Sequence, residues 1–204
     1  MLDIHTHNLQ ASCDAVISVA PSQFAPVAGK LYSVGIHPWF SAEEAARELP
    51  LLEDAASHPQ VVALGETGLD GVKGMDIALQ QRYFAAHIDL AKQMHKPVIV
   101  HMVRTSQQVA KACRGAGVPV IIHGMRGNEN VARTLIDAGF YISYGAHFNP
   151  AALQATPLDR LLVETDDTPV AIETVLEKVS QALSIPTPAL TLTVQRNAAT
   201  LLSL

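Results

Sequence analysis

The sequence of 204 residues predicts an α/β fold, namely a compact (β/α)8 TIM barrel with trimmed helices. Three observations lead to this prediction. Short runs of β-branched and apolar residues alternate with longer stretches of mixed polarity, as in a chain of strand–helix units. Eight such runs can be counted, and polar residues that commonly bind metals stand at the ends of six of them. A doubly wound open sheet shares the alternation, so the placement of the polar residues favours the barrel.

The candidate strands are short, and several are apolar almost throughout, which is typical of strands buried on both faces of a parallel sheet. The connection after the second run contains Pro21, Pro26 and Gly29, so we expect no full helix there. In chain order, the candidate strands are Leu2–His5, Ala15–Ala20, Leu31–Ile36, Val61–Gly65, Pro97–His101, Pro119–His123, Phe140–Tyr144 and Arg160–Glu164.

Helical features are clearest in the stretch Asp76–His95, where apolar residues recur at helical spacing. Asp76 is a suitable N-cap, and Pro97 follows the end of the stretch. A second helix is expected at Asn128–Ala138, because Gly139 is a favourable residue just beyond a helix end. Two further helices are expected at Val170–Leu183 and Leu190–Leu202, and the helical histidines His58, His87 and His95 are expected to face solvent.

Composition limits the classes of protein that fit. Hydrophobic residues make up 49% of the chain and charged residues 16%, which suits one compact domain over residues 1–204. The net charge of −5 disfavours nucleic-acid binding by a broad basic face, so metal ions or a local cluster would have to hold a phosphate. Cys13 and Cys113 have no metal-type spacing and are expected to be reduced thiols. We expect a cytoplasmic protein without a membrane helix, and no stable protein partner is indicated.

Histidines and carboxylates follow the apolar runs in a repeated pattern. His5 and His7 form a His-x-His pair whose side chains point to the same side of a strand. Because the carboxyl ends of all strands meet at one face of a parallel barrel, residues at these ends converge in space. A nitrogen and oxygen ligand set without thiolates suits divalent ions such as zinc, manganese or magnesium, and it is large enough for two of them. The other members of the pattern are His37, Glu66, His101, His123 and Asp166.

These residues resemble the TatD family of metal-dependent nucleases, within the amidohydrolase-like barrels. The resemblance runs over most of the chain and depends on several short segments in a fixed order. The segments are Asp3-Ile4-His5-Thr6-His7, Gly35-Ile36-His37-Pro38, Gly65-Glu66-Thr67-Gly68-Leu69-Asp70, Lys96-Pro97-Val98-Ile99-Val100-His101, Ile122-His123-Gly124 and Glu164-Thr165-Asp166.

The resemblance implies a role for each matching residue. His5, His7 and Asp166 would bind a first metal, and Glu66 would bridge it to a second. His37 would contact the substrate phosphate. Two metals lower the pKa of a bound water to about 7, so that the hydroxide can attack an ester bond. Asp166 would orient that water as general base, with Glu66 as the other catalytic carboxylate. The second metal would be completed by His101 and His123.

The family resemblance also implies a substrate, most readily the phosphodiester bonds of DNA. The rim matches the family less well than the metal ligands do. Val103 stands where the family has an arginine, and Arg104, one residue later, is the candidate phosphate contact. Asp3, Glu164 and Asp70 are expected to orient the ligand residues without binding the metals themselves. The alternatives are a small phosphoester substrate, an amidohydrolase-like enzyme acting on another substrate class, and a barrel that binds metal without catalysis.

Overall fold

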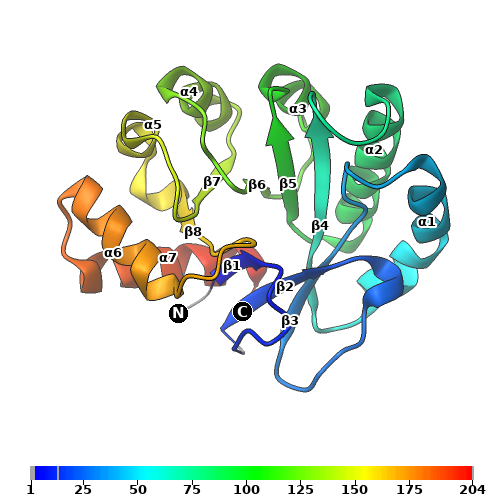
Figure 1. The fold of residues 1–204 in the computed structure, drawn as a ribbon, viewed down its shortest axis with the longest axis horizontal. Coiled ribbons are helices and arrows are strands. Elements are labelled where there is room, and N and C mark those ends of the chain that lie inside the picture. Colours follow the sequence, from blue (N-terminus) through cyan, green and yellow to red (C-terminus); the bar gives the residue numbers. More distant parts are fainter. Residues whose placement is uncertain (1–2, 13, 204) are drawn as a thin grey trace.

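The computed structural model describes residues 3–12 and 14–203, and it contains eight parallel strands in a single sheet, ordered β1 to β8. All eight predicted strands are present, although Leu2 of the first prediction lies outside the described residues. Figure 1 shows the helices around the outside of the strands. The strands are β1 (Asp3–Thr6), β2 (Ala15–Val19), β3 (Leu31–Val34), β4 (Val61–Asp70), β5 (Val98–Val103), β6 (Val120–Ile122), β7 (Tyr141–Tyr144) and β8 (Leu161–Val163).

The first and last strands meet beyond the regular end of β8, which nearly closes the barrel. A parallel bridge joins Thr6 to Asp166. The amide of His7 donates to the Asp166 carbonyl at 3.0 Å, and the amide of Asp166 donates to the His5 carbonyl at 3.0 Å. The closure therefore brings the His-x-His pair and the last aspartate together, and the predicted TIM barrel is confirmed over the open sheet.

The predicted helices are present with small changes at their ends. Asp76 caps α2 by accepting from the Ala78 amide, and Asn128 caps α4 by accepting from the Val131 amide. Only the 3-10 turn η1 (Pro21–Gln23) lies between β2 and β3, as expected. A second 3-10 turn, η2 (Leu158–Arg160), precedes β8. The α-helices are α1 (Ala42–Ser57), α2 (Ile77–Met94), α3 (Ser106–Ala112), α4 (Glu129–Asp137), α5 (Pro150–Ala155), α6 (Ile172–Leu183) and α7 (Thr187–Leu202).

Strand β4 is longer than the sequence pattern indicated. The prediction ended it at Gly65, before the polar residues, but the strand continues to Asp70 and pairs with β5 through its full extension. Glu66 therefore lies inside a strand instead of after one, and β5 likewise continues beyond His101 to Val103. Glu66 and Asp70 are compatible with a strand here because their carboxylates contact polar side chains from other segments instead of the apolar core.

The two largest of the three hydrophobic clusters among the described residues hold the strands in place, and they follow the alternation of side chains along the strands. In β5, Val98 and Val100 pack with helix residues in the larger core, whereas Ile99 belongs to the smaller one. Ile99 and Ile121 each precede a site histidine by two residues and so share its face of the strand. Leu201 of α7 also packs into the smaller core. The site thus stands on a tightly packed apolar base.

The prediction for His87 is wrong. Its ring on α2 is fully buried. Nε2 accepts a hydrogen bond from the Ile36 amide at 3.0 Å, and Nδ1 lies 2.7 Å from the Tyr83 carbonyl oxygen. The ring fastens α2 to the chain just before His37. Among the helices in the described ranges, none has the length and apolar character needed to cross a membrane.

Candidate metal centre

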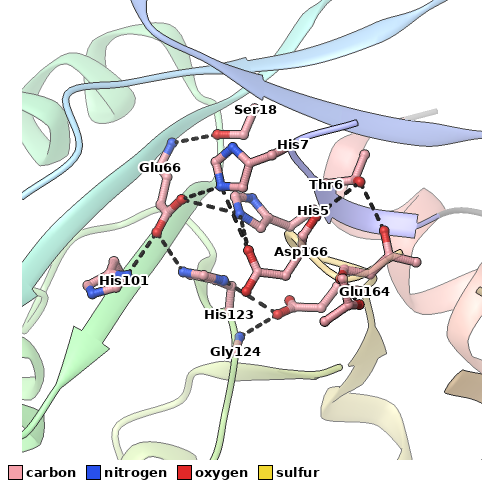
Figure 2. A network of polar contacts seen from close by, with 12 residues as sticks. His5, Thr6, His7, Ser18, Glu66, His101, His123, Gly124, Glu164 and Asp166 are labelled. Atoms are coloured by element: carbon pink, nitrogen blue, oxygen red, sulfur yellow. Dashed lines mark hydrogen bonds and ion pairs between the residues drawn. The ribbon is translucent and has the colours of Figure 1, made fainter. Parts of the chain in front are cut away.

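The carboxylate of Glu66 lies at the centre of five histidine side chains from the ends of four strands, and Figure 2 labels four of these histidines. Glu66 is only 4% exposed, so this negative charge is almost removed from water. A buried carboxylate of this kind requires nearby positive charge or donors. Oε1 lies 2.8 Å from His37 Nε2, from His101 Nδ1 and from His123 Nε2, and Oε2 lies 3.1 Å from His7 Nε2 and 3.3 Å from His5 Nε2.

Asp166 lies on the other side of the His-x-His pair. Its Oδ1 is 3.7 Å from Nε2 of both His5 and His7, which is too long for direct hydrogen bonds. Asp166 has a positive φ of 54°, a conformation that turns the chain immediately after the bridge to β1. The Asp166 carboxylate therefore faces the same space as the two histidine rings without a hydrogen bond to either.

The donor atoms fit divalent cations. His5 is completely buried, yet neither of its ring nitrogens has a hydrogen-bond partner among the described residues. Buried polar atoms are normally satisfied, so an unpartnered imidazole that faces carboxylates is the arrangement expected of a metal ligand. Donor atoms in three groups lie within 4.8 Å of one another, namely His5 with His123 and Asp166, His5 with His7 and Glu66, and His37 with Glu66 and His101.

The pKa values in the centre depend mainly on the interactions between the Glu66 carboxylate and the surrounding histidines. Burial alone would raise the pKa of Glu66, but the charge of His123 and hydrogen bonds from His101 and His123 hold it well below its usual range. Burial opposes charging of His123, yet Glu66 and Glu164 raise its pKa well above the ordinary value. The hydrogen bond to Glu66 also raises the pKa of His7. The protonated forms of His7 and His123 are thus favoured, and binding of a cation to their nitrogens would release protons.

His37 differs from the other histidines in its charge. Burial lowers its pKa, and the hydrogen bond to Glu66 only partly offsets that effect. The imidazole is therefore neutral at neutral pH. The expected contact with a substrate phosphate would have to come from a neutral N–H donor, because a positive charge is not available at this residue.

Two of the candidate ligands also lie near a second carboxylate, on the side of the ring nitrogen that does not face Glu66. Nδ1 of His123 lies 3.4 Å from Oε1 of Glu164, which also accepts from the Gly124 amide at 2.6 Å. Nε2 of His101 lies 3.0 Å from Oδ2 of Asp70. Carboxylates in this position fix the orientation and tautomer of metal-binding histidines.

Asp3 supports the site at the barrel seam. Its carboxylate accepts from the Thr165 amide at 3.0 Å and from the Thr165 hydroxyl at 2.6 Å. Burial raises the pKa of Asp3 to about 7. Its contacts tie the start of β1 to the residue directly before Asp166.

A cavity of about 420 Å³ opens over the centre. Its wall carries a mixture of polar and apolar groups at the carboxyl ends of the strands. Trp39 stands at its mouth with 46% of its surface exposed, and its ring contacts those of His37 and His101 edge to face. The lining residues are His7, Ser18, Val19, Ala20, Gln23, Gly35, His37, Trp39, Phe40, Glu66, His101, His123, Asp166 and Asp167.

A family model described as TatD-related DNase matches residues 8–203. The match covers nearly the whole chain and includes every strand from β2 onward. The chain belongs to the TatD-related DNase family.

Several relatives of this TatD-family chain are named as hydrolases. It is 34% identical over 147 residues to the uncharacterized metal-dependent hydrolase YcfH of Escherichia coli K12, covering 67% of this chain and 55% of YcfH. It is 35% identical over 149 residues to the uncharacterized metal-dependent hydrolase TatD of Mycobacterium tuberculosis, covering 66% and 56%. It is 36% identical over 70 residues to the 3′-5′ ssDNA/RNA exonuclease TatD of Pantoea vagans, covering 34% and 27%. The chain spans about half the length of the curated relatives it matches.

Solved structures of TatD homologues share the fold. The crystal structure of YJJV from Escherichia coli superposes with a TM-score of 0.82 at 24% identity, covering 93% of this chain and 86% of that chain. The TatD-family hydrolase of Entamoeba histolytica gives a TM-score of 0.75 at 14% identity, covering 98% and 97%. These similarities show that this TatD-family chain has the barrel fold, and they show nothing further about its activity.

The structure brings together all six metal-ligand candidates and His37, but it places Arg104 differently. Arg104 is exposed and is absent from the cavity wall. Sequence reasoning missed Ser18, whose hydroxyl accepts from the Glu66 amide at 3.3 Å from within an apolar strand. It also missed Asp167 on the wall and Lys73, whose ammonium lies 3.4 Å from the centre of the Trp39 ring. A lysine in a glycine-rich loop carries no sequence signal for such a position.

Proposed function

We propose that this chain is a metal-dependent hydrolase that cleaves the phosphodiester bonds of DNA. The observation that carries the proposal is the set of five imidazoles around the buried Glu66 carboxylate. Four of these imidazoles line the cavity, and the fully buried His5 ring has no hydrogen-bond partner among the described residues, as expected of a metal ligand. The family match and the exonuclease name of one partial relative favour a nucleic-acid substrate.

We assign the ligands to two divalent ions of zinc, manganese or magnesium type. His5, His7 and Asp166 would hold one ion, and His101 with His123 would hold the other. Glu66 would bridge them, because its two oxygens already face the two groups of histidines separately. When bound, the ions would stabilise negative charge on the phosphate and make water more acidic.

The remaining chemistry belongs to side chains of this chain. The Asp166 carboxylate lines the cavity and is only partly buried, so it can accept the proton of an attacking water as general base. Nδ1 of His37 accepts from the Trp39 amide at 3.0 Å, so the Nε2–H, now 2.8 Å from Oε1 of Glu66, is the donor that would reach a non-bridging phosphate oxygen once cations hold the carboxylate. Asp70, 3.0 Å from Nε2 of His101, would keep that imidazole in the required tautomer, and Glu164, 3.4 Å from Nδ1 of His123, would favour the same orientation there.

The decisive experiment compares substrates on the metal-loaded protein. We expect hydrolysis of a single-stranded DNA oligonucleotide with added manganese or magnesium, complete loss after chelation, and no comparable hydrolysis of a lactone or an amide. Hydrolysis of the lactone or amide in preference to DNA would contradict the substrate class. Binding of metal without hydrolysis of any of the three would show that the barrel is not catalytic.

A variant tests the assigned base. Asp166→Asn keeps the size and one oxygen of the side chain but removes its basicity. We expect turnover to fall by about 10² to 10⁴ while most of the metal remains bound, since a general base contributes a factor of that size. Asp167→Asn lies next to it on the cavity wall and serves as the matched control. Near-normal turnover of Asp166→Asn would show that the role is wrong.

A further inference from the structure

The charged residues that line the cavity are predominantly acidic. Glu66, Asp166 and Asp167 contribute carboxylates, while no lysine or arginine stands among the described residues of the wall. A polyanionic substrate has further phosphates besides the one that reacts, and these would meet this acidic rim unless a cation lies nearby.

Lys73 places a cation beside this mouth. It lies in the loop between β4 and α2, and its ammonium lies 3.4 Å from the centre of the Trp39 ring, which lines the cavity. Stacking of an ammonium on an indole stabilises its position without neutralising it. Within the described part of the chain, no carboxylate forms an ion pair with Lys73, whereas Lys92 pairs with Asp89. The Lys30 and Lys96 ammoniums are occupied by backbone carbonyls.

The Asp70 carboxylate fixes both members of this pair. Its Oδ1 accepts from the amides of Val72 at 2.8 Å and Lys73 at 3.0 Å, which holds the loop. Its Oδ2 accepts from the indole N–H of Trp39 at 2.7 Å. The amide side chain of Gln80 also donates to the Lys73 carbonyl at 3.3 Å. The ammonium is thus presented on a preorganised backbone, so that little order has to be gained when an anion binds.

We propose that Lys73, held over Trp39, binds a non-reacting phosphate of the substrate at the cavity mouth and so determines specificity for substrates with a second phosphate. This inference rests on the proposed function, because it assumes a phosphoester in the adjoining cavity. The second phosphate can be a terminal 5′-phosphate or a 3′-phosphate that continues the strand. The shared chemistry is a phosphate dianion or diester held by one exposed ammonium.

The test uses the metal-loaded protein and measures binding separately from turnover. The probe is a thymidine dinucleotide whose linkage is an uncharged, inert methylphosphonate, prepared with no terminal phosphate, with a 5′-phosphate or with a 3′-phosphate. Trp39 is the one tryptophan of the chain, so its fluorescence reports directly on the mouth of the cavity. The two phosphorylated probes distinguish the two sources of the second phosphate.

We expect at least one phosphorylated probe to bind more tightly than the unphosphorylated one. Lys73→Met should weaken that binding by about tenfold, the usual effect of losing one charge-assisted contact, and leave the unphosphorylated probe unchanged. Lys178→Met removes the same charge from an exposed position on α6 and should change neither affinity. Trp39→Leu, followed by calorimetry, should weaken the same probe by about threefold through loss of the stacked ammonium.

Three results would overturn the inference. They are equal affinity of the wild-type protein for all probes, equal weakening of all probes in Lys73→Met, and no effect of Lys73→Met on the preferred probe. Failure of the proposed function would give a different result. In that case the wild-type protein would not hydrolyse a DNA oligonucleotide. Turnover without a Lys73-dependent preference refutes the inference alone.

Discussion

The Nε2 atom of His101 lies 3.0 Å from Oδ2 of Asp70. The contact leaves Nδ1 of the same ring directed at Glu66, at 2.8 Å. Asp70 therefore decides which nitrogen of this histidine is presented to the centre. Because it also accepts from Trp39, one carboxylate connects the mouth of the cavity to a candidate metal ligand.

Replacing this carboxylate should weaken metal binding without removing a ligand. We expect Asp70→Asn to lower the affinity for zinc by about 10- to 100-fold, as is usual when the partner of a metal-binding histidine is lost. Competition with a chromophoric chelator measures the affinity. Asp137→Asn, on the exposed end of α4, is the control and should bind as the wild-type protein does. An unchanged affinity in Asp70→Asn would exclude this role.

Metal removal should lower the melting temperature. The His5 nitrogens have no hydrogen-bond partner among the described residues, so they gain one when cations bind the folded protein. At a metal concentration of about 100 times Kd, binding adds about 2.7 kcal/mol, which raises the melting temperature of a chain of this size by about 5–10 °C. Scanning calorimetry with metal and with chelator checks the shift. Glu66→Gln should abolish most of it, and a wild-type protein without any shift would contradict metal binding here.

The buried His87 should make stability depend on pH outside the site. Burial lowers its pKa from the ordinary value of 6.5 to about 4. Between these values the unfolded chain binds the proton and the folded one does not, so stability rises with pH over that window and is complete above it. The difference amounts to about 3 kcal/mol.

The measurement is denaturant unfolding at several pH values with chelator present. His87→Gln should be less stable than the wild-type protein at neutral pH, but its stability should fall less on acidification through the same window. His147→Gln, at an exposed position, should keep the wild-type slope. Parallel pH profiles for His87→Gln and the wild-type protein would show that His87 is not the titrating group.

Gly68 should be intolerant of any side chain because of the strand next to it. Its φ is +138°, and a Cβ atom would overlap the carbonyl oxygen of His101. Gly68→Ala must push β4 away from β5 and displace His101. We expect a loss of about 1–3 kcal/mol of unfolding free energy from the overlap, together with weaker metal binding.

A matched glycine separates overlap from backbone strain. Gly115 also has a positive φ, +71°, but nothing lies within 4 Å of its Cβ position. Gly115→Ala should therefore cost only the backbone term, about 1 kcal/mol, and leave metal binding unchanged. If the two variants lost equal stability and bound metal equally well, the close approach of β4 and β5 would not be what matters at Gly68.

The sequence by itself determined where the strands lie and which residues are candidate metal ligands. Strand positions follow from short apolar runs, since burial on both faces leaves a signal in every residue of the run. The ligand candidates follow from the rule that the carboxyl ends of parallel strands converge, which needs no knowledge of side-chain contacts. That is why His5 and Asp166, far apart in the chain, could be expected to meet.

Only the tertiary structure decided the remaining features. The extension of β4 through Glu66 depends on pairing with β5, and local sequence cannot report a neighbouring strand. His87 lies on the buried face of α2, three residues after Phe84, but the hydrogen bond that its ring accepts comes from the Ile36 amide of a distant segment. The placement of Lys73 over Trp39 is likewise a contact between two loops, brought together by the carboxylate of Asp70. Such contacts between distant segments have no periodicity along the chain, and so no sequence pattern announces them.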